Sequence, residues 1–368
     1  MKVLFLANND AGLYKFRKEL IEEIAKKNDV FLCLPYGKYI PQLIRMGGKY
    51  IPCKLECHGM NIIKEINLLN FYRKTLKKVN PDIVFTYTIK PNIYGGIVCS
   101  SMKIPYVVNI TGLGSAVENA GVLQKITLFL YKYSLRKAQK VFFQNIENRN
   151  FMLKQKVTTG SYGLLPGSGV NLKQYQVLDY PHKQVIEFVF VARIMKEKGI
   201  EQYLEAAEYI TRKYSNTRFH ICGDILEVEY EKKINDFQER GIVIYHGAVE
   251  NMEDIYKISH CVIHPTYYPE GLSNVLLESC ASGRPIITTN RSGCREVLDD
   301  GRNGFVVKQK DGKDLVRVIE KFLALSWEEK REMGLLGRKK VESKFDRQIV
   351  IKKYVEEMNC VRERKKIK

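Results

Sequence analysis

The chain has 368 residues, 45% of them hydrophobic and 27% charged, which is enough for two domains with separate cores, and no apolar run reaches the roughly 18 residues of a membrane-spanning helix. The formal net charge of +19 is uneven, because residues 1–165 hold 25 Lys and Arg against 10 Asp and Glu, whereas residues 166–368 hold 35 against 31. A basic first half indicates an anionic partner, which can be nucleic acid, a phosphorylated substrate or an acidic membrane surface.

Residues 1–165 alternate strand-like and helix-like segments. Continuous apolar runs indicate strands buried on both faces, and apolar residues spaced three and four apart indicate amphipathic helices. We therefore expect strands at 3–7, 30–34, 81–88, 105–111 and 141–145, and helices at 14–27 and 62–79. This rhythm is typical of a mostly parallel sheet with helices on both faces.

The second half repeats the rhythm. We expect strands at 187–193, 218–224, 243–247, 261–266, 285–289 and 304–307, with a helix at 200–214 after the first of them. Several of these strands end in glycine or in a polar residue, and open α/β sheets bind ligands at the carboxyl ends of their strands.

The join between the halves is expected near residues 164–175, where two glycines and a proline interrupt the pattern. The predicted fold is α/β, with two Rossmann-like doubly wound domains, 1–165 and 166–345, facing each other across a cleft. The last segment, 346–368, has a helical pattern and ends in RERKKIK. We expect it to pack back on the first domain, and a frayed basic tail is the alternative.

Cysteine usage and the N-terminus bear on the compartment. The nine cysteines are scattered and none forms CxxC, and the closest cluster, Cys53, Cys57 and His58, has no second pair to complete a zinc site. We expect reduced thiols and no bound metal. The opening MKVLFLANND is too short for a signal-peptide core, which predicts a cytoplasmic protein.

Two common phosphate-binding motifs are absent. The dinucleotide fingerprint GxGxxG should follow the first strand, but NNDAGLYK there holds one glycine, and Gly112-Leu113-Gly114 is followed by Val117 where the third glycine belongs. No GxxxxGK[ST] occurs. These absences disfavour a dehydrogenase and a P-loop enzyme.

Two cations stand where the first strand of the second half ends. Arg193 ends the strand, and Lys198 follows it before a helix. Fixed cations in this position suit a diphosphate, and ordinary surface charge is the alternative.

The stretch YYPEGLSNVLLESCASGRP, residues 267–285, predicts a helix whose N-terminus can bind an anion, with Ser273 or Asn274 as its N-cap. Glu270 precedes the helix, Gly271 lets the backbone approach a ligand, and Glu278 lies one to two turns inside. The N–H groups expected to face the anion are those of Leu272, Ser273, Asn274 and Val275. Each carboxylate can hold a vicinal diol, one on a sugar and one on a ribose, although Glu278 can also be an ordinary solvated helix residue.

These residues resemble the GT4 family of glycosyltransferases, which have the GT-B fold. The specific elements are the Arg193 and Lys198 pair and the E-x7-E element from Glu270 to Glu278, and weaker similarity covers nearly the whole chain through AGLYKFR, TIKPNIYG, ITGLGS and PGSGVN. The resemblance implies a hexosyltransferase that retains anomeric configuration, uses a sugar nucleotide, with UDP the expected carrier, and needs no metal or other cofactor.

The resemblance also implies roles for individual residues. Arg193, Lys198 and Glu270 would be catalytic, with the cations on the donor diphosphate and Glu270 on the donor sugar, while Glu278 would bind the ribose. The donor-binding set is completed by Gly12, Gly223, His246, Gly271, Leu272, Ser273, Asn274 and Val275. His264, at another strand end, is a further candidate for donor contact, and a structural role is the alternative for both histidines.

One departure narrows the resemblance. Many relatives carry a histidine in the loop after the fourth strand, whereas here the loop reads VVNITGLGSA, with Asn109 and Thr111. This is similar to the subgroup that extends undecaprenyl-diphosphate-linked sugars in capsule, O-antigen or N-glycan assembly, in which the TIKPN-like and GLGS-like loops face the acceptor. The implied acceptor-binding residues are Asn9, Tyr14, Arg17, Lys90, Asn92, Thr111, Gly112 and Glu118.

The basic first half fits peripheral attachment to the inner face of the cell membrane. Residues 121–140 combine lysines and arginines with large apolar residues in a helical pattern, and such a helix can lie on an anionic bilayer. The alternative is an ordinary domain helix, and both hold together if its apolar side faces the core and its lysines face outward. Residues 71–78 repeat the basic and aromatic character.

Three functions remain open on the sequence. The first is transfer of a hexose or N-acetylhexosamine to a polyprenyl-diphosphate-linked saccharide. The second is GT-B chemistry without the lipid, with a soluble acceptor or as a sugar-nucleotide epimerase. The third, suggested by a pI of about 9.4, is nucleic-acid binding, although no aromatic-rich basic motif or helix-turn-helix is evident.

Overall fold

The computed structural model describes residues 1–55, 61–118, 120–157 and 160–366. They form two compact units: unit 1 comprises Met1–Ser168 and Gln348–Lys368, and unit 2 comprises Gly169–Arg347. The sequence placed the boundary at 165/166 and the start of the last segment at 346. The chain thus leaves unit 1, builds unit 2 and returns to unit 1.

Unit 1 is built on a seven-stranded parallel sheet with the order β3-β2-β1-β4-β5-β6-β7. Its strands are β1 Lys2–Leu6, β2 Asp29–Leu34, β3 Gly48–Pro52, β4 Ile83–Tyr87, β5 Tyr106–Ile110, β6 Lys140–Phe143 and β7 Tyr162–Leu164. β4 and β5 are buried at every position, as expected for parallel strands covered on both faces. The five strands expected in this half are present, and β3 and β7 were not expected.

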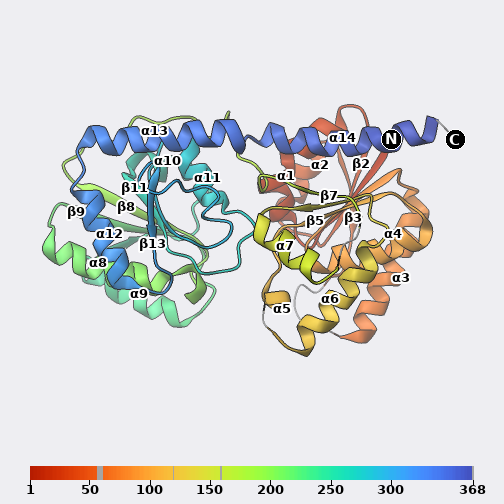
Figure 1. The fold of residues 1–368 in the computed structure, drawn as a ribbon, viewed down its shortest axis with the longest axis horizontal. Coiled ribbons are helices and arrows are strands. Elements are labelled where there is room, and N and C mark those ends of the chain that lie inside the picture. Colours follow the sequence, from red (N-terminus) through yellow and green to blue (C-terminus); the bar gives the residue numbers. More distant parts are fainter. Residues whose placement is uncertain (56–60, 119, 158–159, 367–368) are drawn as a thin grey trace. The chain divides into compact units, whose positions relative to one another are not determined.

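Helices cover both faces of this sheet (Figure 1). One face packs against α1 Asp10–Ala25, α2 Ile40–Arg45 and α14 Arg347–Lys366. The other packs against α3 Ile62–Val79, the π-helical turn η1 Pro91–Gly95, α4 Gly96–Met102, α6 Val122–Leu135 and α7 Ile146–Lys154, and the short α5 Ser115–Glu118 precedes α6. Side chains of α14, among them Tyr354, lie in the core of unit 1.

Unit 2 has a six-stranded parallel sheet with the order β10-β9-β8-β11-β12-β13. Its strands are β8 Ile186–Val191, β9 Thr217–Cys222, β10 Val243–Tyr245, β11 Cys261–His264, β12 Ile286–Thr289 and β13 Gly304–Val307. One face carries α8 Ile200–Lys213, α9 Glu229–Glu239 and α12 Gly312–Leu323, and the other carries α10 Met252–Ile258, α11 Asn274–Ala281 and α13 Trp327–Lys344. The predicted α/β class with two Rossmann-like domains is confirmed.

A buried arginine ties α11 to its neighbours. Arg284 is fully buried and donates from Nε to the Tyr256 carbonyl at 2.6 Å, from Nη1 to the Leu178 carbonyl at 3.0 Å and from Nη2 to the Asp179 carbonyl at 2.8 Å. Burial lowers the pKa of this guanidinium to about 10, so it remains charged at neutral pH. The three bonds hold the end of α11 against α10 and against the segment before β8.

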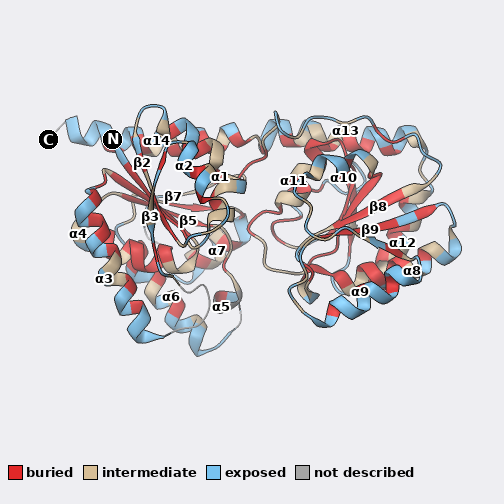
Figure 2. Ribbon diagram, turned by 180° about the vertical axis from the view of Figure 1, so that it is seen from behind, coloured by how far each residue is buried: buried red, intermediate tan, exposed pale blue. Residues whose placement is uncertain are grey.

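Figure 2 shows that the strands are buried while the helices expose their outer faces. In the part of the chain that the structure describes, no helix is both long and apolar enough to cross a membrane. Within the same part, no group of three or more His, Cys, Asp or Glu side chains is arranged to hold a metal ion. Cys57 and His58, of the cluster noted in the sequence, lie outside the described residues.

Candidate functional site

The strand order of unit 2 reverses between β8 and β11, which are neighbours in the sheet although two strands separate them in the chain. In open α/β sheets ligands bind at such a switch point, beyond the carboxyl ends of the strands. The segment after β8 carries Arg193 and Lys198, and the segment after β11 carries Glu270. The topology therefore brings the three predicted catalytic residues to one place within unit 2.

Lys198 and Glu270 form an ion pair between Nζ and Oε1, with side chains only 9% and 16% exposed. Lys198 ends a 3₁₀ turn, η2 Lys196–Lys198, and Gly199 follows it with a φ of +83°. A Cβ on Gly199 would lie 2.3 Å from the Pro265 carbonyl oxygen. Only glycine therefore lets the segment after β8 approach the segment after β11 closely enough for the pair to form.

The Glu270 carboxylate is held in its ionised form. Burial alone would raise its pKa, but the charge of Lys198 and the ring of His264 outweigh burial and lower the pKa to about 2. His264 ends β11, is buried, and places Nε2 3.9 Å from Glu270 Oε1. Burial lowers the pKa of His264, so its ring is neutral at physiological pH, and neither ring nitrogen has a hydrogen-bond partner among the described residues.

Tyr268 contacts both cations, and the sequence reasoning missed it. The centre of its ring lies 4.6 Å from Lys198 Nζ and 5.9 Å from the Arg193 guanidinium carbon, and aromatic ring faces attract such cations. Its backbone N–H donates to the Glu197 carbonyl at 3.0 Å, which holds this segment to η2. The available signal was the pair of tyrosines, Tyr267 and Tyr268, placed directly before the Pro-Glu of the predicted anion-binding loop.

α11 begins where the sequence predicted, with one difference in its donors. Ser273 is the N-cap, but its side chain makes no capping hydrogen bond. Its backbone N–H donates to the Gly293 carbonyl at 2.8 Å, so it is already engaged and leaves the predicted anion-binding set. Gly271 and Leu272 are buried ahead of it. The N–H groups of the first helical turn, which includes Val275, lack acceptors within the helix because of helix geometry.

Glu278 lies in the second turn of α11 and is half-buried beside α10. Its Oε2 accepts a hydrogen bond from the Tyr256 hydroxyl at 3.4 Å. Tyr256 is fully buried, and burial raises its pKa, so the hydroxyl remains a donor. Glu278 is therefore oriented by a buried partner and is not the freely solvated helix residue of the alternative.

Gly223 and His246, the other predicted donor residues of unit 2, have different surroundings. Gly223 follows β9 with a φ of +142°, and a Cβ there would lie 1.7 Å from the Ala192 carbonyl, so packing alone requires glycine. His246 is exposed and places Nε2 2.8 Å from His220 Nδ1, while His220 Nε2 lies 2.8 Å from Glu187 Oε2. Burial and His220 lower the pKa of His246, and the network fixes its ring orientation.

In unit 1 the strand order reverses between β1 and β4, and the first predicted residues follow β1. Asn9 caps α1, because its Oδ1 accepts from the Gly12 N–H at 2.6 Å, and a Cβ on Gly12 would lie 2.9 Å from that oxygen. Gly12, predicted to bind the donor, thus belongs to unit 1 and has a packing role in this cap. Tyr14 stacks on Tyr39 with ring centres 4.7 Å apart.

Arg17 is a buried cation at the same switch point. It is 4% exposed, its Nη1 donates to the Phe16 carbonyl at 2.8 Å, and its Nε has no hydrogen-bond partner among the described residues. Its guanidinium carbon lies 5.4 Å from the centre of the Tyr87 ring, at the end of β4. Since a buried charge is costly unless it is paired, Arg17 is the predicted acceptor residue best suited to an anionic ligand.

Lys90 and Asn92 already have partners inside unit 1. Lys90 Nζ lies 2.7 Å from Glu65 Oε1 in a largely buried ion pair, so its charge is compensated. Asn92 is buried, with Oδ1 accepting from Thr86 at 2.7 Å and Nδ2 donating to the Asn109 carbonyl at 2.9 Å, so its amide supports the loop after β4. The remaining predicted acceptor residues are the half-buried Thr111 and Gly112 after β5, and the exposed Glu118 at the end of α5.

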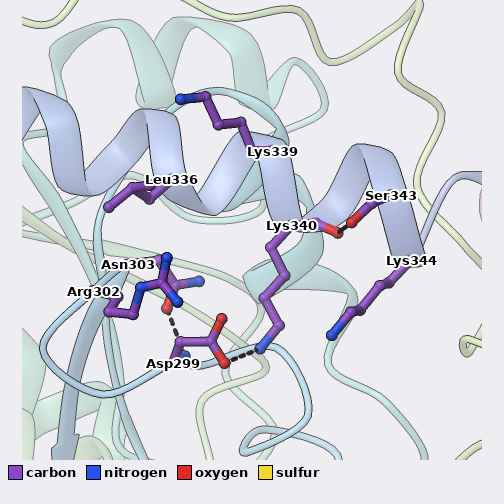
Figure 3. A pocket seen from close by; sticks show the side chains of 8 residues that line it. All are labelled: Asp299, Arg302, Asn303, Leu336, Lys339, Lys340, Ser343 and Lys344. Atoms are coloured by element: carbon purple, nitrogen blue, oxygen red, sulfur yellow. Dashed lines mark hydrogen bonds and ion pairs between the residues drawn. The ribbon is translucent and has the colours of Figure 1, made fainter.

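A separate pocket lies beside β13, an edge strand of the unit 2 sheet (Figure 3). It has a volume of about 250 Å³, and it is lined by Asp299, Arg302, Asn303, Leu336, Lys339, Lys340, Ser343 and Lys344. Lys340 Nζ lies 2.9 Å from Asp299 Oδ1. The pocket sits at the amino end of β13, whereas the predicted donor residues of unit 2 follow carboxyl ends or lie in α11, and it contains none of them.

Two Rossmann-like units, with polar residues gathered at the switch point of each sheet, define the GT-B class of α/β protein. The family model described as "Glycosyl transferases group 1" matches residues 179–340, and "Glycosyl transferase 4-like" matches residues 2–145. The chain therefore belongs to the GT4-like glycosyltransferases, as the E-x7-E element and the cation pair indicated, and it is an enzyme of that class.

Individual relatives agree with this assignment. A Campylobacter jejuni protein named N,N'-diacetylbacillosaminyl-diphospho-undecaprenol alpha-1,3-N-acetylgalactosaminyltransferase is 25% identical over 376 residues, which cover 96% of this chain and 97% of that protein. The Staphylococcus aureus capsular polysaccharide biosynthesis glycosyltransferase CapM is 27% identical over 356 residues, 90% of each chain. The crystal structure of Anabaena Alr3699/HepE in complex with UDP and glucose shares the fold, with a TM-score of 0.79 at 15% identity over 98% of this chain and 100% of that one.

Proposed function

We propose that the protein is a retaining glycosyltransferase that moves a hexose or an N-acetylhexosamine from a UDP-sugar to a polyprenyl-diphosphate-linked saccharide. The C. jejuni relative is named for transfer to a diphospho-undecaprenol-linked sugar, and CapM for capsular polysaccharide synthesis. The Anabaena structure contains UDP and glucose. The product would be a surface polysaccharide or glycan, made at the cytoplasmic face of the cell membrane by a peripherally attached enzyme.

The observation that carries this proposal is the buried ion pair of Lys198 and Glu270 at the switch point of unit 2. A sugar nucleotide presents a diphosphate flanked by hydroxyl groups on both sides. Lys198 and Arg193 would contact the diphosphate at the N-terminus of α11, where the helix dipole favours negative charge. Glu270, ionised, would accept hydrogen bonds from the donor sugar beside the unpartnered His264 ring, and Glu278 from the ribose.

In the proposed step, the bond between the anomeric carbon and the diphosphate oxygen breaks, and its electron pair leaves with UDP. The acceptor hydroxyl bonds to the anomeric carbon on the same face, and its proton passes to the departing phosphate oxygen. Lys198 and Arg193 would stabilise the negative charge that develops on the leaving group. Because these cations and the end of α11 supply positive charge, we propose that transfer needs no metal ion and continues in EDTA.

Acceptor binding would fall to unit 1. Arg17 would pair with the acceptor diphosphate, because it is a buried cation with an unused N–H at the β1/β4 switch point. Asn9 and Tyr14 on α1, with Thr111 and Gly112 after β5, would contact the saccharide. Lys90 would contribute mainly through its ion pair with Glu65, which shapes the loop after β4.

A transfer assay tests the proposal. The purified protein is incubated with a panel of UDP-sugars and a short-chain, water-soluble polyprenyl-diphosphate-linked saccharide, and the product is examined by mass spectrometry and by NMR of the new linkage. We expect one UDP-sugar to give a product that keeps the anomeric configuration of the donor. An inverted linkage, or donor turnover that needs no acceptor, would contradict the proposal.

A matched pair of variants tests the site. Lys198→Met should lower the transfer rate by roughly a hundredfold to a thousandfold, because it removes a fixed charge that stabilises the leaving group. Lys196→Met, in the same turn but with an exposed side chain, should leave the rate within about twofold of wild type. Equal rates for the two variants would show that the site is misassigned.

A further inference from the structure

Two helices of unit 1 expose large apolar side chains, α3 at its N-terminal end and α6 along one side. On α3, Ile62 is 77% exposed, and Ile63 and Ile66 are also exposed; on α6, Phe129 is 69% exposed. The other exposed apolar residues of α6 are Val122, Leu123, Ile126 and Tyr133. Both helices thus place apolar side chains in solvent. Figure 2 shows that the outer faces of α3 and α6 are exposed.

The apolar residues of α6 divide between two sides of the helix. The sequence left open a helix on a bilayer and a domain helix with its apolar side toward the core and its lysines outward; Lys125 and Lys132 are exposed, and Tyr131 and Leu135 are buried with Thr127 and Ser134. Its exposed apolar residues include Val122, Ile126, Phe129 and Tyr133, whose spacing of three and four places them on one helix face. An outward apolar stripe of this length is the mark of an interaction surface.

The exposed ends of α3 and α6 lie on either side of η1, which is buried and packs against both helices. Lys90, directly before η1, pairs with Glu65 in the first turn of α3, so this end of α3 lies beside the loop after β4. α6 follows the loop after β5, and a Cβ on Gly114 in that loop would lie 3.2 Å from Ile89. Both exposed ends therefore flank the two loops predicted to face the acceptor (Figure 1).

The charge along α3 and α6 is positive, with Lys64 and Lys125 near their N-terminal ends. The exposed basic residues on α3, on α6 and directly after α6 are Lys64, Arg73, Lys74, Lys77, Lys78, Lys125, Lys132, Arg136 and Lys137. The single carboxylate on α3, Glu65, is paired with Lys90, α6 has none, and Glu118 precedes α6. A second copy of the chain would bring like charges together on this face, whereas an anionic surface would be attracted.

We propose that a surface, here called the lipid-facing surface, inserts its apolar side chains into an anionic bilayer while lysines and arginines of the same helices contact headgroups. It consists of the exposed apolar residues at the start of α3 and along α6: Ile62, Ile63, Ile66, Val122, Leu123, Ile126, Phe129 and Tyr133. Interfacial helices bind membranes through this combination of apolar and basic residues. A lipid-linked acceptor would then present its diphosphate at headgroup level, beside the loops after β4 and β5. That last step rests on the proposed function, whereas membrane binding itself does not.

Vesicle sedimentation tests the surface. The full-length protein is mixed with phosphatidylcholine vesicles that contain either no anionic lipid or about 30% phosphatidylglycerol. We expect the wild type to pellet with the anionic vesicles only, and Ile63→Ser combined with Phe129→Ser to lower the partition coefficient at least about tenfold. Leu226→Ser combined with Val228→Ser removes two exposed apolar residues of unit 2 and should leave binding unchanged. Equal loss in both double variants, or no pelleting of the wild type, would overturn the proposal.

Two further measurements separate this inference from its alternatives. Phe129→Trp should be quenched by lipids labelled in the acyl chain, while the native Trp327 of unit 2 should not, and an unquenched Phe129→Trp would exclude insertion. The Ile63 and Phe129 double variant should keep its rate with the water-soluble acceptor and lose it with an acceptor embedded in vesicles. If the wild type binds vesicles but transfers no sugar, the proposed function is wrong, while membrane binding by the lipid-facing surface is supported. A change from dimer to monomer in the double variant, with no loss of lipid binding, would instead identify the surface as a contact between copies.

Discussion

Replacing Lys198 by methionine should destabilise unit 2 by about 3 kcal/mol. The pKa of Glu270 falls from an ordinary value near 4.5 to about 2, and each tenfold change in an acid dissociation constant corresponds to about 1.4 kcal/mol, so the surroundings favour the carboxylate by roughly 3 kcal/mol. Methionine removes the positive charge of Lys198, the largest contribution in favour of the Glu270 carboxylate. Burial remains, and burial disfavours the ionised form of Glu270. Because the folded pKa is the lower one, this contribution is complete above pH 4.5 and is lost as the pH falls towards 2.

The single tryptophan of the chain makes this loss measurable in unit 2 alone. Trp327 begins α13 and donates from Nε1 to the Pro181 carbonyl at 2.9 Å. Its ring stacks on that of His182 with ring centres 3.9 Å apart, so its fluorescence reports the unfolding of unit 2. At pH 7.5 the urea midpoint of Lys198→Met should fall by about 1–2 M, since a loss of about 3 kcal/mol is divided by a slope of about 2 kcal/mol per molar.

A variant that lacks both charges tests whether the broken ion pair between Lys198 and Glu270 causes the loss of stability. Lys198→Met combined with Glu270→Gln removes both charges, so most of the lost stability should return. Lys196→Met, which lies in the same turn and is exposed, controls for the loss of a lysine and should shift the midpoint little. The reasoning is refuted if Lys198→Met unfolds like the wild type, or if the double variant is as unstable as the sum of its two single variants.

Three further predictions follow from single contacts. Gly293→Ala should lower the transfer rate at least about tenfold, because its Cβ would lie 2.7 Å from Glu270 Cβ. Gly301→Ala has a similar positive φ with no atom within 4 Å, so it should cost only about 1 kcal/mol of stability and leave the rate unchanged. Equal rates for the two variants would show that Gly293 does not position Glu270. Burial lowers the pKa of His260 from near 6.5 to about 4, so this residue should account for a loss of about 2 kcal/mol in the stability of unit 2 between pH 7.5 and pH 5, as read from Trp327 fluorescence in urea. His260→Asn keeps an acceptor for the neighbouring N–H and should lose about 2 kcal/mol less than the wild type over this range, with the remainder from His264 and His246, whereas a loss equal to that of the wild type would contradict the assignment. Tyr354→Phe, which deletes a buried hydrogen bond to Asn109, should lower the unfolding free energy of unit 1 by about 1 kcal/mol by circular dichroism, and an unchanged value would mean that the bond is worth nothing.

The strands were predictable from the sequence wherever both faces of the sheet are covered. A strand such as β5 is buried throughout and reads as one apolar run, but β3 and β7 lie at the two edges of their sheet, and their partly exposed residues produce no such run. The Arg193, Lys198 and Glu270 grouping was predictable because parallel strands bring their carboxyl ends to one edge. The position of Tyr268 over both cations was not, because it depends on how two loops fold against each other.

The surroundings of a helix were harder to predict than the helix itself. The periodicity of residues 121–140 shows that α6 has apolar residues at helical spacing, but not which of them the protein covers: Tyr131 and Leu135 are buried with Thr127 and Ser134, whereas Phe129 is exposed. For Ser273, the identity of the N-cap followed from residue type, whereas the bond from its N–H to Gly293 comes from a segment about twenty residues later in the chain. Gly12 and Asn92 were assigned to ligands, although their own neighbours account for them.

The return of α14 to unit 1 sets the order in which the chain can mature during synthesis. Unit 2 is continuous from Gly169 to Arg347, so all of its residues are available before α14 is made. Unit 1 begins first but finishes last, because side chains from Val350 to Val361 complete its core and Tyr354 bonds to Asn109 across 245 residues. Until they emerge from the ribosome, one face of the seven-stranded sheet lacks part of its cover, and the nascent chain is open to aggregation and to chaperones.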